Sequence, residues 1–439
     1  MLIEFSVKNF LSFKERTTFS MVAAKPFKEH EESHIIETTR NFKLLKSSVI
    51  YGNNGSGKSN LTRAMLFMKT MVINSLYIAL GTGFDRKFSL QKFALDAASE
   101  KEPAFFEIIF LVNGIIYRYG FEIDHDRVIS EWLFHTTSKE VYLFKRNLQD
   151  VQINRSSFKE GIGREQDLKE SVLFLTLLAT FNKKISADLL TWFDNFKIIT
   201  GINDIGYKRY TVSKLKEDQS FLNWASIFLR FLEITNIATN QDTGSADKTN
   251  EIEHKEDEDV ANLISALKKL QAKQPAQDKV LTFHRKYGPE NILLDTVPFD
   301  LEEDESEGTK KLIYLLGPWY DALKNGKVLV VDELDSRLHS LLTIKLIELF
   351  NNKQNYSAQL ICAVHDTSIL DKDVFRRDQI WFVEKNQFGA SELVSLGEFK
   401  TGTVRNRSSF SKNYLDGRYG AVPYFTSGSK LDEVMYGKE

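Results

Sequence analysis

The sequence predicts an α/β fold built on a central parallel β-sheet. Three segments far apart in the chain carry this prediction, at 48–50, 328–331 and 358–364. Unbroken apolar runs that are rich in valine and isoleucine are typical of parallel strands covered on both faces. Such sheets bind ligands at the carboxyl ends of their strands. The residues that follow these three strands are therefore the first candidates for a functional site.

The segment YGNNGSGKSN, residues 51–60, follows the first strand and matches the pattern G-x-x-x-x-G-K-S/T. Its glycines let backbone N–H groups curl around an anion, and the helix predicted from Lys58 points its positive dipole end at the same anion. Lys58 would reach the β- and γ-phosphates of a nucleotide, and the Ser59 hydroxyl would hold Mg²⁺. The expected nucleotide-binding residues here are Gly52, Asn53, Asn54, Gly55, Ser56, Gly57, Lys58, Ser59 and Asn60.

Two carboxylates, Asp332 and Glu333, follow the second strand. Asp332 would coordinate Mg²⁺, directly or through water, and Glu333 would polarise the water that attacks the γ-phosphate. By itself the pair would favour a strand that ends in a solvated acidic turn. Together with the glycine loop it predicts hydrolysis of ATP, because the segment nearest to a guanine-reading N-K-x-D, NKKI at Asn182, lacks the aspartate.

His365 closes the third strand. In an adjacent parallel strand it would face the same phosphates, where a neutral imidazole can hydrogen-bond the γ-phosphate and sense its presence. The alternative is a histidine that merely ends a strand.

Composition narrows the class of protein. The 439 residues carry a net charge of -2, which argues against a uniformly basic nucleic-acid coat but allows a local patch. The single cysteine, Cys362, excludes an internal disulfide framework and a cysteine-built zinc site within the chain. We expect a cytoplasmic protein with no membrane partner, because no signal region and no run of about 18 apolar residues is found.

The rest of the chain predicts further regions. Short alternating bursts over 104–146, with Asn113-Gly114 between two of them, predict a flanking antiparallel sheet. Helical spacing from about 166 predicts an inserted helical subdomain. Within it, the charged stretch near 240–259 lacks apolar periodicity and predicts a mobile loop. The tail mixes basic and aromatic residues, which could bind DNA or RNA, dock a partner or pack on the protein itself. The predicted domains are an ATPase lobe at 1–165, a helical insertion with a mobile acidic loop at 166–278, a second ATPase lobe at 279–400 and a C-terminal extension at 401–439.

With these residues in place, the chain resembles the ABC-type ATPases, whose ordered marks are the phosphate loop, an Asp-Glu pair followed by a segment such as LDSRLH, and a strand-end histidine. The opening KNFLSF, residues 8–13, is similar to the first strand of the branch that contains the SMC, RecF and OLD proteins. Four segments are more closely similar to the RloA-like AAA-type ATP-binding proteins of bacterial anti-phage and abortive-infection loci. They are ESEGTKKL, DELDSRLH, VHDTSILD with RRDQIWFVEK, and YLDGRYGAVP.

The resemblance implies roles for further residues. Ser306, Gly308 and Thr309 stand where ABC transporters have their serine-glycine signature, so they would open a helix whose N–H groups meet the γ-phosphate of a second subunit. From the residues alone, this segment is a capped helix start, and the acidic run LEEDESE before it would repel ATP unless it faces solvent or a basic surface. Asp335 would cross the interface of a head-to-tail pair of chains. Gln91 is the candidate for a glutamine that contacts Mg²⁺ and the attacking water, or else a solvent-facing strand residue.

The resemblance also implies partners and a function. We expect a homodimer or higher homo-oligomer that closes around ATP and Mg²⁺, senses a phage-derived trigger and controls a separately encoded effector. That effector is expected to be a nuclease, because the roughly 75 residues after His365 are too few for the Toprim domain of OLD proteins. The alternative is a DNA-repair or DNA-tethering ATPase of the RecF and SMC kind.

Overall fold

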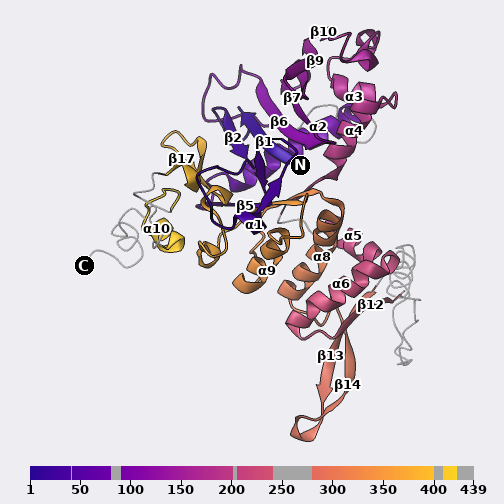
Figure 1. The fold of residues 1–439 in the computed structure, drawn as a ribbon, viewed down its shortest axis with the longest axis vertical. Helices are drawn as coiled ribbons and strands as arrows, with labels where there is room; N and C mark the ends of the chain where they lie inside the picture. Colours follow the sequence, from indigo (N-terminus) through magenta and orange to yellow (C-terminus); the bar gives the residue numbers. More distant parts are fainter. Residues whose placement is uncertain (41, 81–89, 201–204, 241–278, 400–408, 423–439) are drawn as a thin grey trace, which may run out of the picture. The chain divides into compact units, whose positions relative to one another are not determined.

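The computed structural model describes residues 1–40, 42–80, 90–200, 205–240, 279–399 and 409–422 (Figure 1). The chain forms two compact units. The larger one, the main unit, comprises Met1–Asn203 and Asp321–Glu439, and the smaller one, the inserted unit, comprises Asp204–Tyr320. In the residues described, no helix combines the length and the apolar character needed to cross a membrane.

A six-stranded sheet with the order β11-β15-β16-β5-β17-β18 forms the centre of the main unit. All neighbours in it are parallel except β17 and β18, which pair antiparallel. Its strands are β5 (Ser47–Gly52), β11 (Phe196–Ile199), β15 (Val328–Val331), β16 (Gln359–Ala363), β17 (Ile380–Lys385) and β18 (Ser391–Ser395). The predicted α/β class is confirmed, since the three apolar runs form β5, β15 and β16, which are adjacent in this sheet.

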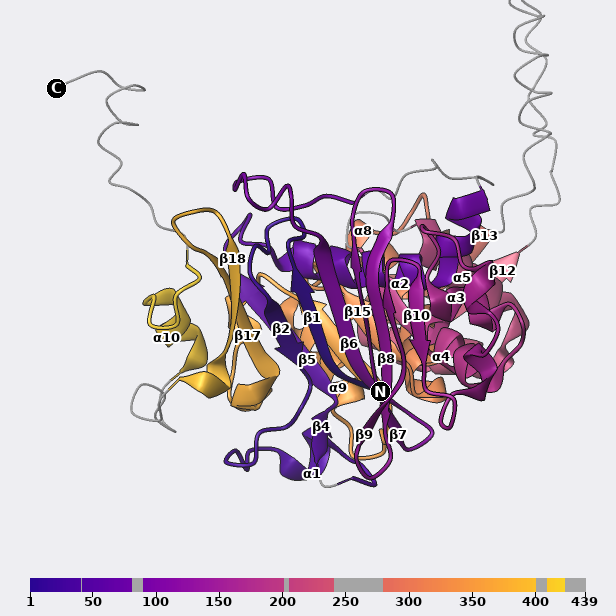
Figure 2. The same ribbon diagram turned by 90° about the horizontal axis from the view of Figure 1, so that it is seen from above.

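A second, antiparallel sheet with the order β10-β9-β8-β7-β6-β1-β2 flanks this core (Figure 2). Its strands are β1 (Leu2–Lys8), β2 (Thr17–Ser20), β6 (Ala104–Val112), β7 (Ile115–Ile123), β8 (Val128–Thr136), β9 (Glu140–Asn147) and β10 (Asp150–Ile153). The predicted hairpin turn at Asn113-Gly114 joins β6 and β7, and both of its residues have positive φ, as a tight hairpin requires. The segment 8–13, expected to be a strand, is instead the end of β1 followed by a tight turn, because Asn9 and Leu11 are left-handed.

Helix α2 (Lys58–Leu80) shares one hydrophobic core with both sheets. Its Met65, Met68 and Met71 are buried together with Phe106 of β6 and Val330 of β15. Two short helices, α3 (Phe174–Ala179) and α4 (Lys184–Asn195), contribute to the same core. Residues 166–199, which the sequence places in the helical insertion, therefore belong to the main unit, because their apolar faces are buried with α2. Helix α9 (Ser340–Phe350) follows β15, and α10 (Phe410–Leu415) follows β18.

The inserted unit contains strands as well as helices. Its elements are α5 (Ile205–Glu217), α6 (Gln219–Leu229), β12 (Asn236–Asn240), β13 (Lys279–Tyr287), β14 (Leu293–Asp300) and the first part of α8 (Glu307–Asn325). The three strands form an antiparallel sheet in sequence order. The predicted mobile acidic loop lies outside the described residues.

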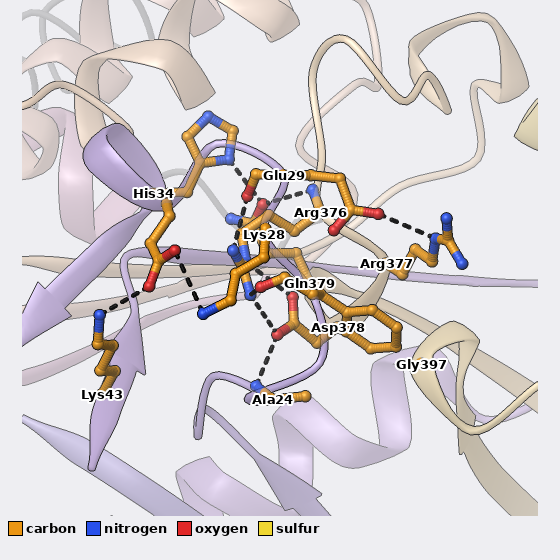
Figure 3. Close-up of polar contacts among 12 residues, drawn as sticks. Ala24, Lys28, Glu29, His34, Lys43, Arg376, Arg377, Asp378, Gln379 and Gly397 are labelled. Atoms are coloured by element: carbon orange, nitrogen blue, oxygen red, sulfur yellow. Dashed lines mark hydrogen bonds and ion pairs between the residues drawn. The ribbon is translucent and has the colours of Figure 1, made fainter. Parts of the chain in front are cut away.

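A buried ion pair fastens the N-terminal segment before α1 to the start of β17 (Figure 3). The fully buried Arg376 donates to both carboxylate oxygens of Asp378 at 2.9 Å, and its other N–H groups donate to the carbonyl oxygens of Phe27 and Glu29. Asp378 also accepts the N–H of Ala24 at 2.7 Å. The segment held in this way leads into α1 (Glu31–His34), β3 (Ile35–Glu37) and β4 (Lys43–Leu45). Residues 376–379 (RRDQ) therefore hold together two segments that are far apart in the sequence.

Candidate nucleotide-binding site

The glycine loop connects β5, which ends at Gly52, to α2, which begins at Lys58. Its first and last glycines are required by close packing. A Cβ on Gly52 would lie 2.3 Å from the carbonyl oxygen of Val383, and one on Gly57 would lie 2.3 Å from Ser391 Oγ, with φ at +118°. Any side chain at either position would force the loop away from β17 and β18.

The Lys58 ammonium lies inside this loop. It is buried, and Nζ donates to the carbonyl oxygens of Gly52 at 2.6 Å and Asn53 at 3.1 Å. Burial lowers the pKa of Lys58 to about 8, against the raising effect of nearby carboxylates, of which Asp332 is the strongest. The lysine of the loop and the acidic pair are therefore close enough to interact.

Asp332, directly after β15, is buried, and burial raises its pKa. A hydrogen bond from the side chain of Ser59 lowers that pKa in opposition, so the first turn of α2 touches the end of β15. A second observation points to a cation at this position: Asp332 Oδ1 is buried and has no hydrogen-bond partner among the described residues. A serine hydroxyl beside a free carboxylate oxygen fits Mg²⁺, which takes one or two protein oxygens and completes its shell with phosphate and water.

A cleft of about 650 Å³ opens between the phosphate loop and the turn at residues 332–336, which we call the acidic turn. Its lining residues are Asn53, Asn54, Gly55, Ser56, Gly57, Lys58, Ser59, Asn60, Glu333, Asp335, Ser336 and His365. Two polar atoms at the loop, Asn53 Oδ1 and Ser56 Oγ, are buried and have no hydrogen-bond partner among the described residues. The volume suits a small ligand with several polar groups.

The acidic turn is joined to the end of β16 by Asp335. Its Oδ2 accepts the backbone N–H groups of His365 at 2.7 Å and Asp366 at 2.6 Å. Glu333 stands in the same turn with φ at +51°, a left-handed conformation that is uncommon for glutamate, and both Glu333 and the exposed His365 line the cleft. Asp335 thus has a role within its own chain, and the crossing contact that the resemblance implies for it stays a prediction.

Gln91 is not among the residues that line the cleft. Its side-chain oxygen accepts from Arg63 Nη2 at 3.0 Å, and its backbone oxygen accepts the N–H of Leu11 at 2.7 Å. The structure therefore places Gln91 beside α2 rather than with Ser59 and Asp332.

Ser306, Gly308 and Thr309 lie in the inserted unit, at the start of α8. Ser306 Oγ accepts the N–H of Thr309 at 3.1 Å, as an N-cap residue does. The acidic run before it is largely engaged within this unit. Glu302 pairs with Lys208 at 2.5 Å, and Glu305 accepts from His284 Nε2 at 2.7 Å. Because these contacts engage two of its carboxylates, the acidic run should repel ATP less strongly than the sequence alone predicts.

Two serines that the sequence did not single out hold the loop in place. Ser391, at the start of β18, donates from Oγ to the carbonyl oxygen of Ser56 at 2.5 Å and lies 2.7 Å from Ser12 Oγ. Ser12 in turn accepts from Asn60 Nδ2 at 2.8 Å. Lone serines carry no sequence signal for such a role, because their partners are set by the packing of β1 and β18 against the loop.

A comparison with known protein families assigns the chain to one of them. A family model described as "AAA domain, putative AbiEii toxin, Type IV TA system" matches residues 47–371, from the start of β5 to shortly after His365. The chain belongs to this family. None of the curated proteins matches it.

Solved structures similar to this member of the AAA family include three SMC heads. The "SMC head domain from Thermotoga maritima" is 14% identical, and the match covers 90% of this chain and 98% of that chain with a TM-score of 0.38. "The SmcHead bound to the C-winged helix domain of ScpA" is 14% identical, with 90% of this chain and 97% of that chain covered and a TM-score of 0.40. The Smc head domain with an extended coiled coil bound to the C-terminal domain of ScpA from Pyrococcus furiosus is 14% identical, with 95% of this chain and 98% of that chain covered and a TM-score of 0.36.

Proposed function

We propose that this AAA-family chain hydrolyses ATP in the cleft between the phosphate loop and the acidic turn. The cleft that the phosphate loop and Glu333 line together carries the proposal, because it brings the two motifs to one place, as a magnesium-bound triphosphate needs. The loop N–H groups and Lys58 bind the phosphates. Ser59 and Asp332 would hold Mg²⁺, which would neutralise charge on the phosphate oxygens.

Glu333 performs the chemical step. Its carboxylate accepts a proton from water as the water oxygen bonds to the γ-phosphorus and the bond from that phosphorus to the β–γ bridging oxygen breaks. His365, at the end of the neighbouring strand β16, hydrogen-bonds the γ-phosphate and so distinguishes ATP from ADP. The products are ADP and phosphate.

Nucleotide affinity should fall as the pH rises above about 8, where free Lys58 loses its proton. Only the protonated amine attracts phosphate, so each further pH unit should weaken binding by up to about tenfold until the pKa of the bound state is reached. Titrations with a fluorescent ATP analogue between pH 6.5 and 9.5 measure this. A Lys58→Arg variant, whose guanidinium stays charged, is the control and should show a flat profile. A wild-type profile that is equally flat would contradict the assignment of Lys58.

We propose further that two chains pair head to tail, so that the α8 start with Ser306, Gly308 and Thr309 meets the γ-phosphate held by the partner. The positive dipole end of a capped helix start suits such an anion, and the pairing of Glu302 and Glu305 reduces its repulsion.

A mixing experiment tests the shared site. Lys58→Ala and Ser306→Arg chains should each be inactive, yet an equal mixture should regain about a quarter of wild-type ATP turnover, because half of the pairs then hold one intact site of two. Unfolding midpoints of both variants control for misfolding. Mixed pairs verified by two affinity tags that show no recovery would rule out a site built from two chains.

The biological role that we propose is defence against phage. ATP state in the assembly would control a separately encoded effector, a nuclease, in response to a phage-derived trigger. The family description, with its AbiEii toxin, and the similarity to RloA-like proteins support this role. The RecF-like alternative is less well supported, because the aromatic residues Tyr414 and Tyr419 of the tail are buried and not free to stack bases. A nuclease gene next to this one would favour defence, and a recombination gene would favour repair.

A further inference from the structure

The C-terminal motif, residues 409–422, folds into a closed unit beside the site. After α10 the chain turns back through Gly417, Gly420 and Ala421, all with positive φ. The hydroxyl of Tyr414 donates to the carbonyl oxygen of Ala421 at 2.8 Å and so fixes the end of the turn. Ala421 is fully buried although its φ of +58° is unfavourable for alanine, which indicates that the surrounding contacts hold it in place.

Aromatic side chains attach this motif to the central sheet, where α10 lies next to β17 (Figure 2). The rings of Tyr414 and Tyr419 each stack on Phe382 of β17 with centroids 5.3 Å apart. Tyr414 also lies 5.9 Å from the ring of Tyr51, the residue of β5 that precedes Gly52. The motif therefore packs directly behind the strand that carries the phosphate loop.

From this position the motif reaches the loop itself. Asn53 Nδ2 donates to the carbonyl oxygen of Val422 at 3.0 Å, and the backbone oxygen of the same Asn53 accepts from Lys58 Nζ at 3.1 Å. The other amide atom, Asn53 Oδ1, is buried without a partner among the described residues. Val422 thus orients a loop residue that contacts the phosphate-binding lysine.

The motif also influences the opposite side of the cleft through Tyr51. The Tyr51 hydroxyl donates to the carbonyl oxygen of Asp366 at 3.2 Å, and the N–H of Asp366 donates to Asp335. One aromatic stack is therefore connected both to the phosphate loop and to the turn that carries His365.

We propose that the C-terminal motif is a positioning element of the nucleotide site. Asn53 and Tyr414 are its positioning residues: the loop binds nucleotide tightly when the motif is docked on Tyr51 and Phe382. By thermodynamic reciprocity, bound nucleotide then stabilises the docked motif by the same factor. The inference rests on the proposed nucleotide binding, and it adds a coupling between that site and the C-terminal part of the chain.

The test combines binding and hydrogen exchange on the full-length protein with Mg²⁺ and the non-hydrolysable analogue AMP-PNP. Asn53→Ala and Tyr414→Phe should each weaken AMP-PNP binding about three- to tenfold, the effect of one hydrogen bond. In the wild type AMP-PNP should slow amide exchange over 413–422 by a similar factor, and in Asn53→Ala this protection should be lost. Tyr356→Phe, which changes an exposed tyrosine, is the matched control and should bind like the wild type.

The outcomes separate this inference from the proposed function. Wild-type protein that fails to bind AMP-PNP would overturn both. If it binds and both variants bind equally well, the positioning role alone is overturned. Weaker binding by Asn53→Ala with normal binding by Tyr414→Phe would assign Asn53 to a direct nucleotide contact, and would also overturn it. Unfolding midpoints establish that the variants are folded.

Discussion

ATP turnover by a Glu333→Gln variant should fall by about a hundredfold or more, while its affinity for ATP stays close to that of the wild type. The amide keeps the size and the hydrogen-bonding reach of the carboxylate, but it cannot accept a proton from the attacking water. Glu333 stands in a left-handed turn and lines the same cleft as the phosphate loop, and Asp335 fixes this turn to the end of β16. Phosphate release and nucleotide binding, measured separately, distinguish loss of chemistry from loss of binding.

Lys58→Ala should abolish nucleotide binding as well as turnover. Removing the buried ammonium leaves the phosphates without the cationic side chain that binds them, so binding itself should be lost and turnover with it.

Glu348→Gln, on the exposed side of α9, is the matched control for Glu333→Gln and should turn over ATP normally. In infected cells, both site variants should abolish protection against phage if the defence role is right. Normal turnover by Glu333→Gln would remove this residue from the chemical step.

The convergence of the phosphate loop and the acidic pair could be predicted from the sequence because each motif carries its own local signal. The glycines, Lys58 and Ser59 have fixed spacing, and the valine-rich run before Asp332 can hardly be anything but a buried parallel strand. Since parallel strands end at one edge of a sheet, strand prediction alone brings the two motifs near each other.

Other features depend on tertiary packing and leave no such trace. Helical periodicity shows that residues 174–195 form helices, but not that their apolar faces are buried against α2 instead of joining the inserted unit. The contact of Ser391 with the loop, and that of the loop residue Asn53 with Val422, depend on which backbone oxygen the fold brings within reach. Gln91 illustrates the same difficulty, since a lone glutamine between elements has no local pattern that fixes its partner.

The stability of the main unit should depend strongly on the buried pair of Arg376 and Asp378 (Figure 3). Asp378→Ala should destabilise it by about 3–5 kcal/mol, because it leaves the fully buried guanidinium of Arg376 without a counter-charge and frees the N–H of Ala24. Urea unfolding followed by tryptophan fluorescence measures the shift in midpoint.

A double variant decides whether the pair itself or the unpaired charge is responsible. Replacing both partners, as Arg376→Met with Asp378→Ala, should cost clearly less than Asp378→Ala alone, because no charge is then buried without a partner. Glu32→Ala is the matched control: the ion pair of Glu32 with Lys353 also joins the N-terminal segment to the second half of the chain, but it is exposed, so its loss should leave the midpoint unchanged. If the double variant is as unstable as the single one, the buried contacts of Arg376 with the Phe27 and Glu29 carbonyls, not its charge pairing, hold the N-terminal segment on β17.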